Sequence, residues 1–221
     1  MGTKLNPQTI NLGIDCNPVE KTTFIKLFKE FKDVFAWTYD DMKTFNTQVM
    51  QHIILIKQES KPFQQKLRKY HPSLEPTIKK ELNKLLAAKI IFPIKHTQWV
   101  ANLVLVRKKN RDIRLCVDFR NLNKSSEKDN YPVPPMEQIL QKASGSEMLS
   151  LLDSLLVYNQ ILVYPDDQLK TTFRTPWGIY AYRKMPFGLI NVGEPFQREM
   201  DIAFRGLGNL FKGQWIFLLE G

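Results

Sequence analysis

Apolar residues recur at helical spacing in two stretches of the chain. In the first, Phe24, Leu27, Phe28 and Phe31 fall at i, i+3, i+4 and i+7. They follow Asn17-Pro18-Val19-Glu20, which has a capping residue, a first-turn proline and an early acid. This pattern predicts an amphipathic helix near 18–33 whose apolar face packs in a core.

The second helical stretch begins at Pro76 and cannot continue through Pro93. Its apolar stripe is Ile78, Leu82, Leu85, Leu86 and Ile90. The other face is basic, and it is either solvated or turned toward phosphate; it carries Lys79, Lys80, Lys84 and Lys89.

Strand patterns dominate the rest of the chain. Residues 100–106 are apolar and branched, and residues 113–120 alternate strictly between apolar and polar, which predicts a hairpin with a basic tip. Further strands are expected at 160–164, 170–175 and 179–184, with helices after Pro135 and from Gly193. Mixed helices and antiparallel pairs indicate an α+β fold.

Charge is unevenly distributed along the 221 residues. The net charge is +10, and residues 57–124 hold 17 of the 32 Lys and Arg residues but 5 of the 22 Asp and Glu residues. Such a segment is typical of polyanion binding, although a solvated basic surface would have the same composition.

Several function classes find no support in the composition. No run approaches the roughly 20 apolar residues of a membrane span, and the first residues lack a secretory signal. Cys16 and Cys116 lie too far apart for a zinc or disulfide framework, so reduced thiols and an intracellular location are expected. His52, His71 and His96 share no metal-ligand spacing.

One acidic residue ends a short apolar run. Residues 148–152 predict a buried strand, Asp153 follows directly, and Tyr158 comes five residues later. Asp153 is suited to ligating a hard cation such as Mg²⁺, or to satisfying a turn.

Several ordered motifs together resemble one family. They are VRKKNRDIRLCVDFRNLNK, DNYPVPP, LSLLDSLLVYNQ, DQLKTTFRTPWGIYAYRKMPFGLIN and PFQREMDIAF. In this order and spacing they resemble the reverse transcriptase of gypsy-type LTR retrotransposon polyproteins. The resemblance implies a right-hand polymerase fold with four parts: a pre-polymerase linker at 1–56, basic fingers at 57–129, a partial palm at 130–207, and a divergent tail at 208–221.

The same resemblance implies site residues and partners. Asp153 matches the first catalytic, Mg²⁺-binding aspartate, and Tyr158 matches the aromatic residue beside the sugar of the incoming nucleotide. Arg114, with Lys108 or Lys109, matches the residues that hold the triphosphate, and Phe187 matches a position beside the nucleotide. Arg107, Arg111 and Lys124 are assigned to nucleic-acid binding. The implied partners are an RNA or DNA template-primer and a dNTP.

The family's YxDD motif is missing from these 221 residues. Residues 206–221 contain one acid, Glu220, and one carboxylate cannot hold two divalent ions against their repulsion. We therefore expect a truncated or decayed reverse transcriptase without polymerase activity. Two alternatives are a nucleic-acid-binding module without catalysis and a poorly folded remnant.

Overall fold

The chain forms two compact units in the computed structural model, Met1–Lys43 and Thr44–Gly221. The structure describes residues 2–3, 6–7, 10, 12–34, 36, 38, 41–107, 113–133, 135–144 and 158–203. The predicted catalytic Asp153 and the predicted basic tip at Lys108, Lys109 and Arg111 lie outside the described residues.

The first unit is built around α1 (Pro18–Glu30), with β1 (Gly2–Thr3), β2 (Asn6–Pro7) and the short 3₁₀ helix η1 (Lys32–Val34). The predicted capping box is present. Asn17 Oδ1 accepts from the backbone N–H of Val19 and Glu20 at 2.9 Å, and Glu20 accepts from the Asn17 N–H at 2.8 Å. The predicted core packing is wrong for the described part of this unit, because α1 buries none of its residues and Phe24 stays 39% exposed.

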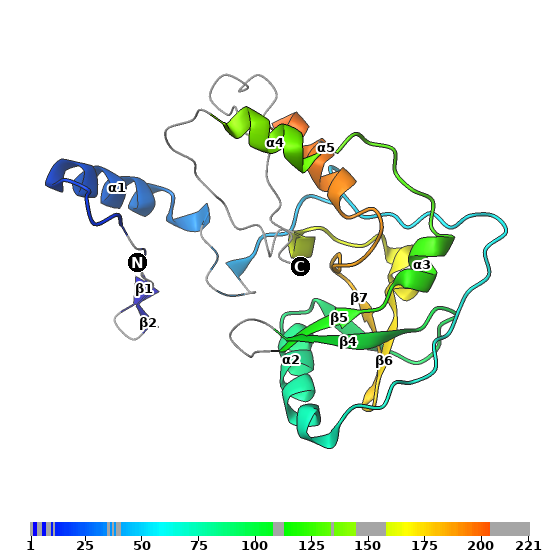
Figure 1. Ribbon diagram of the computed structural model, residues 1–221. Helices are drawn as coiled ribbons and strands as arrows, with labels where there is room; N and C mark the ends of the chain where they lie inside the picture. The colour runs from blue at the N-terminus through cyan, green and yellow to red at the C-terminus, as the bar shows by residue number, and fades with distance from the viewer. Residues whose placement is uncertain are drawn as a thin grey trace. The chain divides into compact units, whose positions relative to one another are not determined.

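A mixed sheet lies at the centre of the second unit (Figure 1). Its described strands are, in spatial order, β3 (Ile91–Ile94), β7 (Gly178–Tyr182), β6 (Phe173–Thr175), β4 (Ala101–Arg107) and β5 (Ile113–Val117). Strands β4 and β6 are parallel, and the other neighbours are antiparallel. Pro93 lies in β3 at the sheet edge, where its missing N–H does not interrupt a central ladder.

The predicted hairpin is confirmed, but its second strand is shorter than expected. Val106 pairs with Arg114 and Arg107 pairs with Ile113, and β5 ends at Val117. The predicted continuation to Arg120 is wrong, because Asp118 turns inward and α3 (Arg120–Ser125) begins directly. Alternating residues alone did not reveal this turn.

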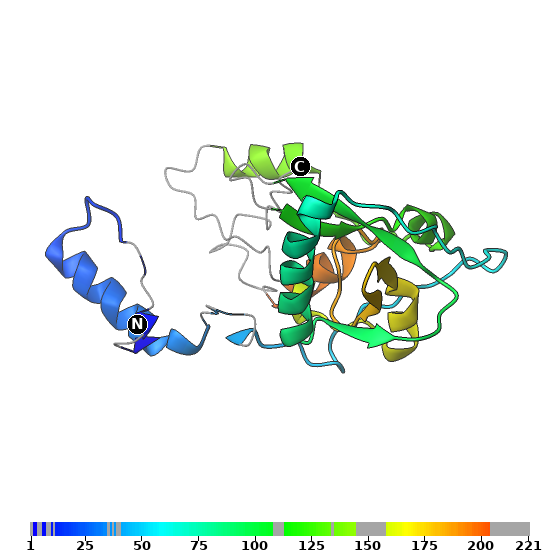
Figure 2. The ribbon, with the colours of Figure 1, turned by 90° about the horizontal axis from the view of Figure 1, so that it is seen from below.

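Helix α2 (Glu75–Ala87) follows the short η3 (Pro72–Leu74) and packs against β3 and β5 across one face of the sheet (Figure 2). The predicted stripe is confirmed at its centre, where Ile78 and Leu82 are buried. The helix ends before Lys89, which takes a left-handed φ of 54°.

The remaining described elements are α4 (Met136–Ala143), η4 (Tyr158–Gln160), η5 (Pro165–Thr171) and α5 (Gly193–Ala203). Two predicted strands are wrong in extent. Leu162 and Val163 form isolated bridges. Because Pro165 starts a helical turn, η5 extends through Thr171, and the strand expected at 170–175 is present only as β6, Phe173–Thr175. None of the described helices is long and apolar enough to cross a bilayer.

An extended segment, residues 50–70, precedes α2 and runs along the second unit. At its start, His52 bridges Val163 in parallel. At its end, Gln64 bridges Val100 just before β4. This upstream segment therefore contacts both the loop after η4 and the root of the hairpin.

Candidate nucleotide and nucleic-acid site

Two aromatic residues assigned to the nucleotide site lie in contact. The ring of Tyr158, in η4, meets Phe187 edge to face with centroids 4.8 Å apart, and Phe196 of α5 lies 6.3 Å from Tyr158. Tyr158 is buried and Phe187 is 36% exposed, so the pair has one interior and one surface member. Burial, with the nearby Glu194 carboxylate, raises the pKa of the Tyr158 phenol to about 12.

The loop that carries Phe187 is fixed to the end of the hairpin. Gly188 has a φ of +92°, a conformation that favours glycine, and it packs against Val117. Asn123 of α3 donates to the Gly188 carbonyl at 2.7 Å and accepts from the Ile190 N–H at 3.0 Å. Residues far apart in sequence thus set the position of Phe187.

The basic residues of the prediction are only partly described. Arg114 is half-buried on β5, opposite Val106. Lys124 has an exposed side chain at the end of α3, and its carbonyl accepts from Lys57 Nζ at 3.0 Å. Arg107 belongs to β4, but its side chain lies outside the described part, as do Lys108, Lys109 and Arg111.

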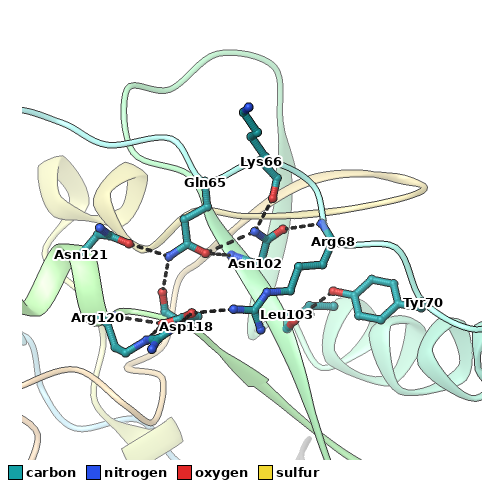
Figure 3. A network of polar contacts seen from close by, with 9 residues as sticks. All are labelled: Gln65, Lys66, Arg68, Tyr70, Asn102, Leu103, Asp118, Arg120 and Asn121. Atoms are coloured by element: carbon teal, nitrogen blue, oxygen red, sulfur yellow. Dashed lines mark hydrogen bonds and ion pairs between the residues drawn. The ribbon is translucent and has the colours of Figure 1, made fainter.

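A polar network that the sequence did not reveal joins the upstream segment to the hairpin root (Figure 3). Gln65 Nε2 donates to the Asp118 carbonyl and to Asn121 Oδ1, each at 2.9 Å. Gln65 Oε1 accepts from the backbone N–H of Asn102 at 3.0 Å and from its side chain at 3.2 Å. Asn102 in turn accepts from the Arg68 N–H at 3.2 Å.

Asp118 is the charged centre of this network. Arg120 grips it with Nε at 2.8 Å and Nη2 at 2.7 Å, and Arg68 Nη2 lies at 3.1 Å. The hydrogen bond from Arg120 is the main reason that the pKa of Asp118 is lowered. One buried carboxylate therefore holds two arginines, which leaves a net positive charge at this surface.

A second ion pair holds the chain after α3 against α5. Arg198 Nη2 lies 2.9 Å from Asp129 Oδ2, and its guanidinium lies 4.6 Å from the centroid of the Tyr131 ring. Asn191 accepts from the Asp129 N–H at 3.0 Å. A pocket of about 510 Å³ lies beside this pair, lined partly by the exposed Ile53 and Leu55.

A buried cluster anchors the start of the upstream segment. Asp167 accepts from the Ile54 N–H at 2.7 Å and pairs with Lys170, which also donates to the Ile54 carbonyl at 2.9 Å. His52 is buried nearby, and desolvation lowers its pKa to about 4 although Asp167 opposes the shift. Asp166 and Asp167 therefore belong to a structural turn rather than to a metal site.

No group of three or more His, Cys, Asp or Glu side chains within the described ranges could hold a metal ion. The residues described do not fit a two-metal centre, and Asp153 is outside them. No chemical step can be derived through a metal from this geometry.

Known sequences are similar to this chain. A family model described as reverse transcriptase (RNA-dependent DNA polymerase) matches residues 106–217, about half of the chain. The Retrovirus-related Pol polyprotein from transposon 412 of Drosophila melanogaster is 30% identical in an alignment of 201 residues that covers 85% of this chain and 16% of that polyprotein. The Transposon Tf2-3 polyprotein of Schizosaccharomyces pombe is 30% identical over 183 residues, which are 82% and 14%.

Solved structures give the same fold. A prototype foamy virus protease-reverse transcriptase mutant superposes with a TM-score of 0.71 at 17% identity, over 86% of this chain and 25% of that one. The foamy viral protease-reverse transcriptase in complex with an RNA/DNA hybrid gives 0.64 at 16% identity, over 91% and 29%. These likenesses confirm the predicted α+β, polymerase-type fold; the chain spans about a sixth of its curated relatives.

Proposed function

The chain belongs to the reverse transcriptase family, and we propose that it forms the fingers and part of the palm of an RNA-directed DNA polymerase. In this proposal residues 57–129 are the fingers and residues 130–207 the partial palm. They bind an RNA or DNA template-primer and a dNTP. Residues 1–56 form a pre-polymerase linker, and residues 208–221 form a divergent tail.

The contact between Tyr158 and Phe187 supports this proposal most directly. The two residues were assigned to the nucleotide from the family motifs, and their rings lie 4.8 Å apart. Asn123 fixes the Phe187 loop to α3, which directly follows the hairpin that carries Arg114. In this proposal Arg114 holds the triphosphate, and the sugar of the nucleotide lies toward this aromatic pair.

Metal binding limits what the chain does alone. Reverse transcriptases as a family use divalent metal ions, and two-metal nucleotidyl transfer needs several carboxylates. We assign Asp153 as the family's first Mg²⁺ ligand. Because these 221 residues contain no YxDD, we propose that they do not catalyse polymerisation by themselves.

Primer extension on an RNA template with Mg²⁺ or Mn²⁺ tests the proposed inactivity. The expected result is no template-dependent product from the 221-residue chain. Extension that disappears in Asp153→Asn would overturn the proposal, because it would mean that this chain completes a metal site. Extension unchanged by Asp153→Asn would point to a contaminating polymerase, so the assay includes that variant from the start.

Nucleic-acid binding without catalysis is a second function that the charge distribution favours. Residues 57–124 concentrate the positive charge of the chain, and contacts to phosphate release counterions. Binding should therefore be insensitive to sequence and weaken steeply with salt. Replacing Lys108, Lys109, Arg111 and Arg114 with Gln should flatten the salt dependence, and unchanged binding would eliminate this function.

A further inference from the structure

The outer face of α2 carries an open groove lined by residues without an assigned role. Its volume is about 620 Å³, and the side chains that line it all belong to α2 and are exposed: Pro76, Lys79, Lys80, Asn83, Lys84 and Ala87. Counted from Pro76 they fall at i+3, i+4, i+7, i+8 and i+11, so they form one stripe along the helix. At about 1.5 Å per residue the stripe is about 16 Å long.

The positive charge of this stripe is only partly neutralised within the described residues. Lys84 pairs with Glu81 at 2.6 Å. No carboxylate of the described residues pairs with Lys79 or Lys80. A molecule that complements this face is therefore acidic.

An indole lies near the N-terminal end of the stripe. Lys79 Nζ is 6.0 Å from the centroid of the Trp177 ring, in the turn between β6 and β7, and Trp177 is half-buried. Arg174 of β6, three residues earlier, forms no ion pair with the described residues, and its buried Nε has no hydrogen-bond acceptor among them. The β6–β7 hairpin thus adds an aromatic surface beside Lys79 and a further cation without a counter-charge.

We propose that the outer face of α2, together with Trp177, docks an acidic segment of a partner protein. Carboxylates of the partner pair with Lys79 and Lys80, and an apolar side chain of the partner packs on Trp177 and Pro76. The inference does not depend on the proposed function.

The carbon atoms of the groove favour a protein over a polynucleotide backbone. Pro76, Ala87 and the methylene stems of the lysines present apolar surface between the ammonium groups. A sugar-phosphate chain supplies charge for the ammonium groups but little apolar surface for the rest. Tryptophan is enriched among the residues that contribute most to protein–protein binding.

A solvated helix face is the competing explanation. Exposed ammonium groups attract an acidic peptide wherever they lie on the molecule, and salt screens that attraction. Docking instead depends on particular positions and on the uncharged Trp177 side chain. Moving the same loss of charge elsewhere, and removing the indole without any change of charge, separate the two explanations.

The test measures the fluorescence anisotropy of a labelled peptide of about 12 residues, which as a helix matches the stripe, with leucine at every fourth position and glutamate elsewhere. In the 221-residue chain at about 150 mM salt, Lys79→Gln with Lys80→Gln should weaken binding about tenfold. Lys26→Gln with Lys29→Gln removes the same charge from exposed positions of α1 and is the matched control, expected within about twofold of wild type. Equal losses in the two double variants would overturn the inference, and so would a wild-type chain that does not bind the peptide.

Trp177→Ala gives the second readout, because it leaves the charge unchanged. It should weaken peptide binding about tenfold, and Trp177→Phe should restore most of the loss. Unchanged affinity in Trp177→Ala would reduce the surface to non-specific attraction and overturn the inference. Thermal unfolding checks that each variant is folded. Should Trp177→Ala not fold, Lys79→Glu with Lys80→Glu takes its place: the exposed reversal should abolish peptide binding, and retained binding would overturn the inference.

Single-stranded DNA of about the same length is a separate arm, since bases can also stack on an indole. Lys79→Gln with Lys80→Gln should leave DNA affinity within about twofold of the wild-type chain. A loss of DNA affinity larger than the loss of peptide affinity would assign this face to nucleic acid and overturn the protein partner.

Discussion

Asp118 and Asp167 hold the two ends of the upstream segment, residues 50–70, and both carboxylates are buried, with side chains 5% and 6% exposed. Each accepts a backbone N–H and pairs with a cation. Asp167 takes the Ile54 N–H and Lys170, whereas Asp118 takes the Arg120 N–H and two arginines.

The cations make the difference between the two anchors. Lys170 is 27% exposed and also donates to the Ile54 carbonyl, so its ammonium group is bound to partners inside the protein. Arg120 is 76% exposed and keeps donors for solvent or ligand. A buried aspartate thus forms an interior ion pair at one end of the segment, and at the other end it holds arginines whose positive charge is exposed.

The largest expected effect is at the interior anchor. Asp167→Asn leaves the Lys170 ammonium largely buried without its carboxylate, and it should lower the free energy of unfolding by about 4 kcal/mol. Urea unfolding followed by circular dichroism measures this loss. Lys170→Met in the Asp167→Asn background should recover part of it, because the unpaired charge is then removed as well.

A loss below about 1 kcal/mol in Asp167→Asn would break the comparison, since it would mean that water reaches Lys170 as readily as it reaches the arginines. Nucleic-acid affinity measured at a temperature where the variant stays folded should not change.

The next effect is a pH dependence at the same anchor. His52 has a folded pKa of about 4, below the 6.5 of the unfolded chain, chiefly because burial disfavours its charged form. The unfolded chain therefore binds the proton first as pH falls. Stability is complete above pH 6.5 and should decline by about 3 kcal/mol as pH falls toward 4.

Urea unfolding at several pH values between 7 and 4 measures this decline. His52→Leu keeps a buried apolar volume and should flatten the curve over that window. A variant that still loses the same stability would assign the pH dependence to another group.

The sequence predicted the parts of the fold that depend on local pattern. The α1 cap, the α2 stripe and the β4–β5 hairpin follow from spacing and from proline positions. Strand ends were missed where a side chain overrides alternation, as at Asp118 and in η5. Both turns are also held by hydrogen bonds to residues more than 30 positions away in sequence, which no local pattern contains.

The candidate site, like the fold, was predicted only in part. Family motifs assigned Tyr158 and Phe187 to the nucleotide site, and the structure places their rings in contact; the assignment itself stays a prediction. Gln65, Arg68 and Asn102 were missed because each is an ordinary polar residue until the upstream segment pairs with Val100. The available signal was the concentration of positive charge from residue 57 onward, which indicated a surface but not its members.

The smallest expected effect is at the exposed anchor, and it sharpens the comparison most. In Asp118→Asn both arginines can be hydrated by solvent, so the free energy of unfolding should fall by only about 1 kcal/mol relative to the wild-type chain. The pKa of Asp118 is lowered in the folded state, chiefly by the hydrogen bond from Arg120, so its contribution is present above about pH 4 and lost as pH falls further. The wild-type and Asp118→Asn curves should therefore converge below pH 4, outside the window assigned to His52. A stability loss as large as that of Asp167→Asn would mean that Asp118 stabilises the fold as strongly as Asp167 does, and the contrast between the two anchors would fail.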